Sequence, residues 1–148
     1  LPESLRDGQT RAALLDWYEA PWSAGEASAL LSAYNKLATA RDVFTKAFEE
    51  AKEAGVVTEG TSQAAFATLT LPADAATALA DVDLAEVFVC AAVEVVSGEG
   101  FSCAVAPAVG EKCPRCWNVR ELGGNAHHPH VCERCGDVLD SIGFSEED

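Results

Sequence analysis

Two cysteine pairs near the C-terminus decide the local fold: Cys113-Pro-Arg-Cys116 and, after fifteen intervening residues, Cys132-Glu-Arg-Cys135. The spacing C-x2-C-x15-C-x2-C is typical of zinc sites. Two residues between thiols form a tight knuckle that turns both sulfur atoms toward one ion. Two knuckles then supply four thiolates at about 2.3 Å in a tetrahedron, whereas a redox motif needs only one pair. The sequence therefore predicts one Zn2+ held by four cysteines, within a finger over residues 111–139.

The predicted ion is structural, because four protein ligands leave no open coordination position. Tetrahedral four-sulfur geometry also suits iron, as in a rubredoxin-like centre, and the spacing leaves that alternative open. We expect the histidines between the two pairs to be exposed loop residues rather than ligands, able to touch a phosphate when protonated. They are His127, His128 and His130.

The bulk composition is that of a globular protein. The chain has 148 residues, of which 49% are hydrophobic and 23% charged, as in a folded domain. No apolar run approaches the ~18 residues of a membrane helix, and the first residues carry no basic-then-apolar signal. Because four of the six cysteines stand in metal spacing, we expect a reducing, cytoplasmic setting and no membrane partner. The absence of methionine predicts that the chain is a piece of a longer polypeptide.

The net charge of −14 is unevenly distributed. Residues 1–110 carry 16 acidic and 6 basic side chains, residues 111–135 sum to +1, and residues 136–148 carry five acidic side chains and no basic one. A nucleic-acid-binding protein that acts alone shows a basic footprint. This chain lacks one, although the cysteine segment is its least acidic part.

Upstream of the cysteines, a long helix is predicted over Ser23 to Ala54. Apolar residues step by three and four along this segment, Ser23 and Glu26 form a capping-box pattern, and Gly55 is a candidate C-terminal cap. At 1.5 Å per residue the helix is about 45 Å long. The stripe that we expect to face the core comprises Leu30, Tyr34, Leu37, Phe44, Phe48 and Ala51.

A small antiparallel sheet is predicted next. Strands are expected over residues 63–71, 86–96 and 101–108, with a short crossover helix from Pro72 to Leu79. The turn residues Ser97-Gly-Glu-Gly100 join the second and third strands into a hairpin. The fold class is therefore α+β: a long N-terminal helix, a small antiparallel sheet and a zinc-knuckle module.

Two further cysteines, Cys90 and Cys103, fall on opposite arms of the predicted hairpin. We expect both to behave as small buried hydrophobic residues, which is the usual role of free cysteine.

Four segments follow from these predictions. They are a helical lead-in over residues 1–25, a helix-and-sheet domain over residues 26–110, the finger over residues 111–139 and an acidic tail over residues 140–148. We find no catalytic residues: the chain has no phosphate-cradling glycine loop, no paired nucleophile and base, and no open metal position.

Three residues beside the cysteines are candidates for nucleic-acid contact. Arg115 and Arg134 occupy the same place in the two knuckles, where they would either pair with nearby acids and cover the zinc loop or bind phosphate bidentately. Trp117 follows the first knuckle and would act either as a lid over the metal site or as a platform on which a base stacks.

The motif Glu111-Lys-Cys-Pro-Arg-Cys-Trp117, a histidine-containing loop and Val131-Cys-Glu-Arg-Cys135 resemble the C-terminal zinc finger of bacterial isoleucyl-tRNA synthetases. The upstream chain is similar to the same family: Leu37–Lys52 resembles its long helix, and Thr61–Leu69 resembles the strand that follows. The resemblance runs in order from about residue 22 to residue 138. It is therefore more specific than the finger alone.

This resemblance implies a parent class I aminoacyl-tRNA synthetase, a ligase that joins isoleucine to its tRNA with ATP during protein biosynthesis. Catalysis would occur in upstream domains, and this segment would help to hold the tRNA near the anticodon stem. The four cysteines match the zinc ligands of the family. The implied partners are the cognate tRNA and the rest of the synthetase, with the parent expected to be a monomer.

Two other readings fit the cysteines. A DNA-repair glycosylase of the formamidopyrimidine type has similar zinc knuckles, but it lacks the long helix followed by a sheet. An acidic zinc-ribbon module that binds other proteins would stand alone, and the missing methionine argues against it.

Overall fold

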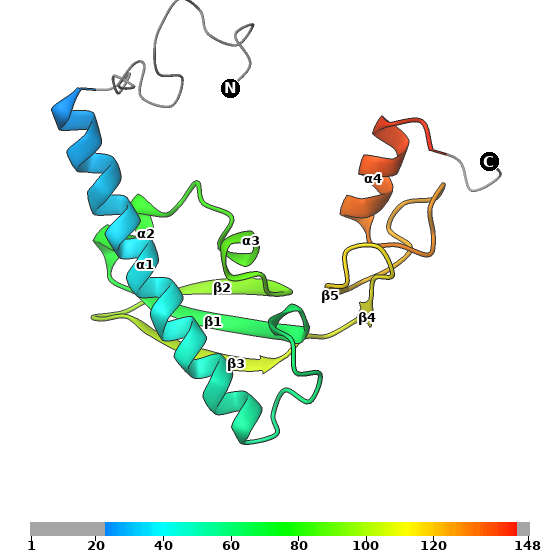
Figure 1. The fold of residues 1–148 in the computed structure, drawn as a ribbon, viewed down its shortest axis with the longest axis horizontal. Coiled ribbons are helices and arrows are strands. Elements are labelled where there is room, and N and C mark those ends of the chain that lie inside the picture. Colours follow the sequence, from blue (N-terminus) through cyan, green and yellow to red (C-terminus); the bar gives the residue numbers. More distant parts are fainter. Residues whose placement is uncertain (1–22, 145–148) are drawn as a thin grey trace, which may run out of the picture. The chain divides into compact units, whose positions relative to one another are not determined.

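The computed structural model describes residues 23–144 (Figure 1). The chain divides into two compact units between Ser32 and Ala33. The first unit contains the start of α1 (Ala24–Glu53). Ser23 caps this helix through its side chain: its hydroxyl accepts from the Glu26 amide at 3.3 Å, and both its hydroxyl and its amide donate to the Glu26 carboxylate at 2.7 Å. The predicted capping box is thus confirmed. Residues 1–22 of the predicted helical lead-in lie outside the described residues.

The second unit is built on a three-stranded sheet with β1 (Ala65–Leu71) at its centre. A 3-10 turn, η3 (Ser62–Ala64), leads into β1. β2 (Ala92–Ser97) pairs with β1 in parallel, and β3 (Ser102–Pro107) pairs with its other side antiparallel. The parallel connection runs through α2 (Ala73–Ala78) and α3 (Leu84–Phe88), as Figure 1 shows. We refer to residues 33–110 as the sheet body.

One face of the sheet carries the core. Alternate residues of β1 are buried against α1, α2 and α3, as the two-residue period of a strand requires. The ring centroids of Phe44 in α1 and Phe88 in α3 lie 4.9 Å apart with nearly parallel planes. Leu69 and Leu71 of β1 are fully buried in the same cluster.

The predicted hairpin is wrong, and so is the all-antiparallel sheet. The segment expected to form a strand from residue 86 first completes α3, and β2 begins only at Ala92. β2 and β3 are not neighbours, because β1 inserts between them. The apolar run from Val87 to Val93 reads equally well as a buried helix end or a buried strand, and periodicity does not separate the two.

The expected core stripe of α1 is only partly buried. Phe44 and Phe48 lie in the core and Leu37 and Ala51 pack at its edge, as predicted. Leu30 and Tyr34 are instead 60% and 64% exposed. Seven strand residues span about 23 Å, whereas thirty helical residues span about 45 Å, so β1 is too short to cover the whole helix.

The two additional cysteines do not lie on the arms of a hairpin. Cys90 is buried in the link between α3 and β2, while Cys103 is half-buried in β3. Burial raises the pKa of Cys90 to about 11 and also raises the pKa of Cys103. Both thiols therefore stay protonated and behave as the expected small apolar groups.

The finger follows β3 and has its own small core. β4 (Glu111–Lys112) and β5 (Val119–Arg120) form an antiparallel pair, and α4 (Glu133–Ser141) begins in the finger. A second hydrophobic cluster joins the cysteines to Val131 and Leu139. Asp140, which the sequence assigned to the acidic tail, lies in α4. Within residues 23–144, no helix has the length and apolar character needed to cross a membrane.

Candidate metal centre

The first knuckle is the turn between β4 and β5. The amide of Cys113 donates to the Asn118 carbonyl at 2.9 Å, and the amide of Trp117 donates to the Cys113 carbonyl at 2.8 Å. These bonds fold the Cys-Pro-Arg-Cys segment back on itself. The turn closes with Trp117 in a left-handed conformation, at φ 65°.

The second knuckle is the start of α4. Cys132 is the N-cap residue, and Cys135 lies in the first turn, where the Gly136 amide donates to the Cys132 carbonyl at 3.0 Å. An isolated antiparallel β-bridge pairs Cys132 with Leu122, which lies just after β5. This bridge holds the start of α4 beside the first knuckle. A helix N-terminus favours negative charge, which suits a pair of thiolates.

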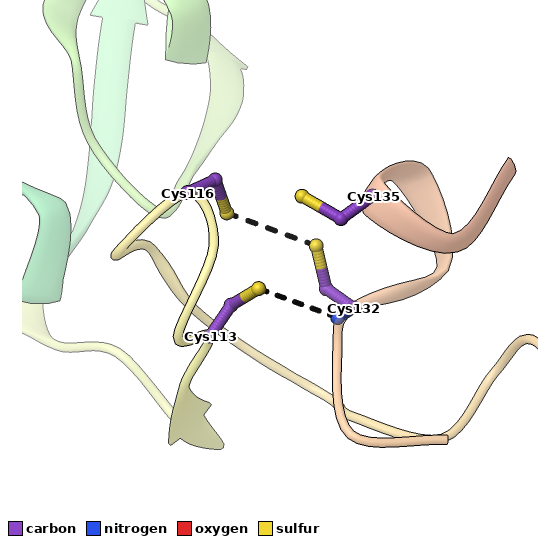
Figure 2. Close-up of side chains that lie close together, drawn as sticks. All are labelled: Cys113, Cys116, Cys132 and Cys135. Atoms are coloured by element: carbon purple, nitrogen blue, oxygen red, sulfur yellow. Dashed lines mark hydrogen bonds between the residues drawn. The ribbon is translucent and has the colours of Figure 1, made fainter. Parts of the chain in front are cut away.

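The four sulfur atoms of Cys113, Cys116, Cys132 and Cys135 lie within 4.8 Å of one another (Figure 2). Tetrahedral zinc with bonds of about 2.3 Å requires sulfur atoms about 3.8 Å apart. The measured separation of Cys116 Sγ and Cys132 Sγ is 3.8 Å. The Cys132 amide also donates to Cys113 Sγ at 3.5 Å. The donor set and its spacing therefore fit one structural zinc ion.

Only one of the four metal-binding thiols has a lowered pKa. Burial raises the pKa of Cys113, but backbone hydrogen bonds from Cys116, Cys132 and Arg115 outweigh it and lower the pKa to about 6. Burial raises the pKa of the other three thiols, Cys116, Cys132 and Cys135. A dication stabilises all four thiolates. Metal binding is thus needed to ionise the full set at neutral pH.

A polar network organises the loop between the knuckles, around the buried side chain of Asn125. Its carbonyl oxygen accepts from the amides of His127 and His128, at 2.9 and 3.1 Å. Its amide group donates to Asp137 at 3.2 Å and to Asp140 at 2.7 Å, both in α4. Asn125 therefore fastens the loop to the helix. The sequence offered no sign of this role, which depends on the two segments meeting in space.

The histidines do not all lie on the surface, as the sequence predicted. His127 and His130 are exposed, but His128 is only 2% exposed. Its Nε2 lies 3.5 Å from the Asp140 carboxylate, which also accepts from His127 Nδ1 at 3.1 Å. The prediction is wrong for His128 because Asn125 turns the loop backbone inward beneath α4.

The three candidate contact residues sit differently around the cysteines. Trp117 is 61% exposed, with Lys112 Nζ 6.0 Å from its ring centroid. Arg115 is exposed, and its guanidinium group acts to lower the pKa of the Cys135 thiol against the larger effect of burial. Arg134 Nη2 lies 3.5 Å from Glu86 of α3.

Comparison with known proteins extends these observations. A family described as "Zinc finger found in FPG and IleRS" matches residues 110–146. The isoleucine–tRNA ligase of Dechloromonas aromatica is 36% identical over 122 residues, covering 80% of this chain and 13% of the relative. The isoleucine–tRNA ligases of Saccharophagus degradans and Exiguobacterium sibiricum are 36% and 34% identical over 89% and 87% of this chain, and each is covered to 15%.

The sulfur geometry and the family match together define a zinc finger of the type found in FPG and IleRS, with one structural zinc ion. The similarity to the ligases also covers the helix and the sheet. Over most of its length the chain therefore matches a zinc-binding domain of isoleucine–tRNA ligases. It spans between 13% and 15% of the length of these curated relatives.

Proposed function

We propose that the chain is the C-terminal, tRNA-contacting zinc domain of a cytoplasmic, monomeric isoleucine–tRNA ligase. The ligation of isoleucine to tRNA with ATP would take place in domains outside this chain. The observation that carries the proposal is the length of the similarity, which runs through the helix, the sheet and the finger. The finger alone would also fit the other protein group named in the family description.

The proposed contact surface is centred on Trp117. Stacking of a base on an aromatic ring contributes about 1–3 kcal/mol, and the exposed ring of Trp117 is free to take part in it. Arg115 and Arg134 flank the cysteines on the two knuckles, where a guanidinium can bind a phosphate through two hydrogen bonds. The metal knuckle would hold these side chains on a rigid base.

The charge of the chain limits how much binding this surface can supply. RNA affinity comes largely from the release of counterions by neutralised phosphates, and the net charge here is −14. Arg134 is also partly committed to Glu86. We therefore propose an accessory contact that orients tRNA, with most of the affinity supplied by the rest of the ligase.

A chimaeric ligase tests this function. The segment of the Dechloromonas aromatica ligase that matches this chain is replaced by the chain itself, and the affinity for isoleucine tRNA is measured. Because base stacking would be lost, Trp117→Ala should weaken binding by about 5- to 150-fold, the equivalent of the stacking energy. Trp117→Phe should retain most of it.

Zinc content and circular dichroism of each chimaera serve as controls for folding. Equal tRNA affinity of the parent chimaera, Trp117→Ala and Trp117→Phe would remove the proposed stacking contact. Loss of binding in all three would instead indicate that the chain does not replace the native segment.

A further inference from the structure

A short segment of the sheet body reaches the first zinc knuckle at two points. Gln63 in η3 donates from Nε2 to the carbonyl of Cys116 at 3.2 Å, across 53 residues of sequence. Glu59, four residues earlier, lies 3.9 Å from Lys112 Nζ, and the same ammonium lies over the Trp117 ring. Both contacts are to immediate neighbours of Trp117, the residue proposed to contact RNA.

The Gln63 side chain is itself held in place. Thr61 caps η3 by accepting from the Gln63 backbone amide at 3.4 Å. Its hydroxyl also donates to Gln63 Oε1 at 3.4 Å. With the oxygen of the amide group directed to Thr61, the nitrogen faces the knuckle. The donor to Cys116 is therefore fixed before any ligand arrives.

The carbonyl that Gln63 holds belongs to the peptide group between Cys116 and Trp117. The other end of this peptide group, the Trp117 amide, donates to the Cys113 carbonyl at 2.8 Å. One peptide group is thus fixed at both ends, once from the finger and once from the sheet body. Its plane sets the φ angle of Trp117, which is 65°.

A left-handed conformation costs a residue other than glycine about 1–2 kcal/mol and persists where surrounding contacts enforce it. We propose that Gln63 is a positioning residue that fixes the direction of the Trp117 ring relative to the sheet body. This inference rests on the proposed RNA contact of Trp117 for its functional part. Glu59 has the lesser role, because its half-exposed ion pair with Lys112 is of the kind that contributes little to stability.

The first experiment measures the position of Trp117 without RNA, by NMR of the zinc-loaded chain. Gln63→Ala and the isosteric Gln63→Glu both remove the donor to Cys116. The amide signals of Cys116 and Trp117 and the Trp117 indole signal should shift in both variants. The matched control is Ser62→Ala, which removes the neighbouring contact from Ser62 Oγ to the Val89 carbonyl at 2.8 Å and leaves the knuckle untouched.

The positioning role is overturned if Gln63→Ala and Ser62→Ala leave the Trp117 signals equally unchanged. Shifts at Trp117 in the Gln63 variants alone support it. This result does not depend on any nucleic acid, so it separates the positioning role from the proposed function.

The second experiment is a double-mutant cycle on tRNA affinity in the chimaeric ligase. Gln63→Ala should weaken binding by about 2- to 10-fold, the range of one hydrogen bond. In the Trp117→Ala background it should cause no further loss, because the group that it positions is absent. An equal loss in both backgrounds would contradict the coupling between the two residues.

A Trp117→Ala chimaera that binds tRNA normally would overturn the RNA contact instead. The NMR shifts at Trp117 would then still establish Gln63 as a structural anchor of the knuckle. The failure of the positioning role and the failure of the proposed function are thus distinguishable.

Discussion

Residues other than the four cysteines also hold the finger in its folded shape. The four cysteines could be found from spacing, because metal-ligand geometry is local and repeats in any chain that has it. The role of Asn125 could not be found in this way, because its side chain bonds to two distant carboxylates on α4 as well as to two amides of its own loop. The same contact explains why His128 is buried although the sequence around it is polar and rich in glycine and proline.

The close approach of Gly136 to Asn125 can be tested by one methyl group. A Cβ added to Gly136 would lie 2.7 Å from Asn125 Cγ. Alanine is the better helix former, but overpacking costs about 1–3 kcal/mol. Gly136→Ala should therefore lower the stability of the zinc-loaded finger by about 1–2 kcal/mol, measured by hydrogen exchange of its amides.

The control is Gly100→Ala, where an added Cβ meets no atom within 4 Å. It should leave exchange in the finger unchanged. A finger that tolerates Gly136→Ala as well as Gly100→Ala would mean that Asn125 does not pack against α4 as described.

An ion pair joins α1 to α2 and gives a pH-dependent prediction. Lys36 Nζ lies 2.9 Å from the Asp74 carboxylate, and this hydrogen bond holds the pKa of Asp74 below its usual value of 3.8. A lowered carboxyl pKa adds stability above the unfolded-state pKa and loses it as the pH falls through the folded-state value. Asp74→Asn should therefore lower the urea midpoint slightly at pH 6.

The difference in urea midpoint between Asp74→Asn and the unmodified chain should disappear once the Asp74 carboxyl is protonated. Urea titrations at several pH values, followed by a probe in the sheet body, measure it. A difference that grows toward acid pH would contradict the assigned pairing.

At the scale of elements, the sequence located α1, β1, α2 and β3 to within about two residues of their observed ends. Their periodicity, capping residues and proline position are strong local signals. The assignment failed between α3 and β2, where helix end and strand form one apolar run. Val89 ends α3 and separates it from β2. It adopts φ 55°, a conformation that valine rarely takes.

Val89 therefore supplies a test of the observed chain path. Glycine adopts positive φ without steric cost, and Val89 is 51% exposed, so Val89→Gly should lose little burial. We expect it to raise the free energy of unfolding by about 0.5–1 kcal/mol. Chemical denaturation of the zinc-loaded chain measures the change.

The same substitution in a strand should have the opposite sign. Val96 lies in β2 and is 41% exposed, and glycine weakens strands. Val96→Gly should therefore destabilise the protein. If both substitutions destabilised it equally, Val89 would not be strained at the end of α3.

The described residues of the second unit form two hydrophobic clusters, and the four metal-binding cysteines lie in the second of them. Removal of zinc should unfold the second cluster, because metal binding supplies about 10 kcal/mol or more of apparent folding energy in such modules. Cys116→Ser should accordingly lose amide protection in the finger while α1 and the sheet keep theirs. Complete loss of helical circular dichroism would contradict the independence of the sheet body.

The net charge of the whole chain limits its affinity for tRNA. The chain alone carries a net charge of −14, so its zinc-loaded form should barely retard tRNA in a gel at physiological salt. The matched comparison is the chimaeric ligase, which contains the same surface within a larger protein. Tight binding by the isolated chain that resists added salt would refute the accessory role.

Photo-cross-linking shows whether the finger touches tRNA within a ligase. The chimaeric ligase is irradiated with isoleucine tRNA and, separately, with duplex DNA, and the linked peptides are identified by mass spectrometry. We predict cross-links from tRNA to the segment containing Arg115 and Trp117, and none from the duplex. Efficient cross-linking of tRNA elsewhere in the ligase, with none in residues 111–139, would mean that the finger does not contact tRNA.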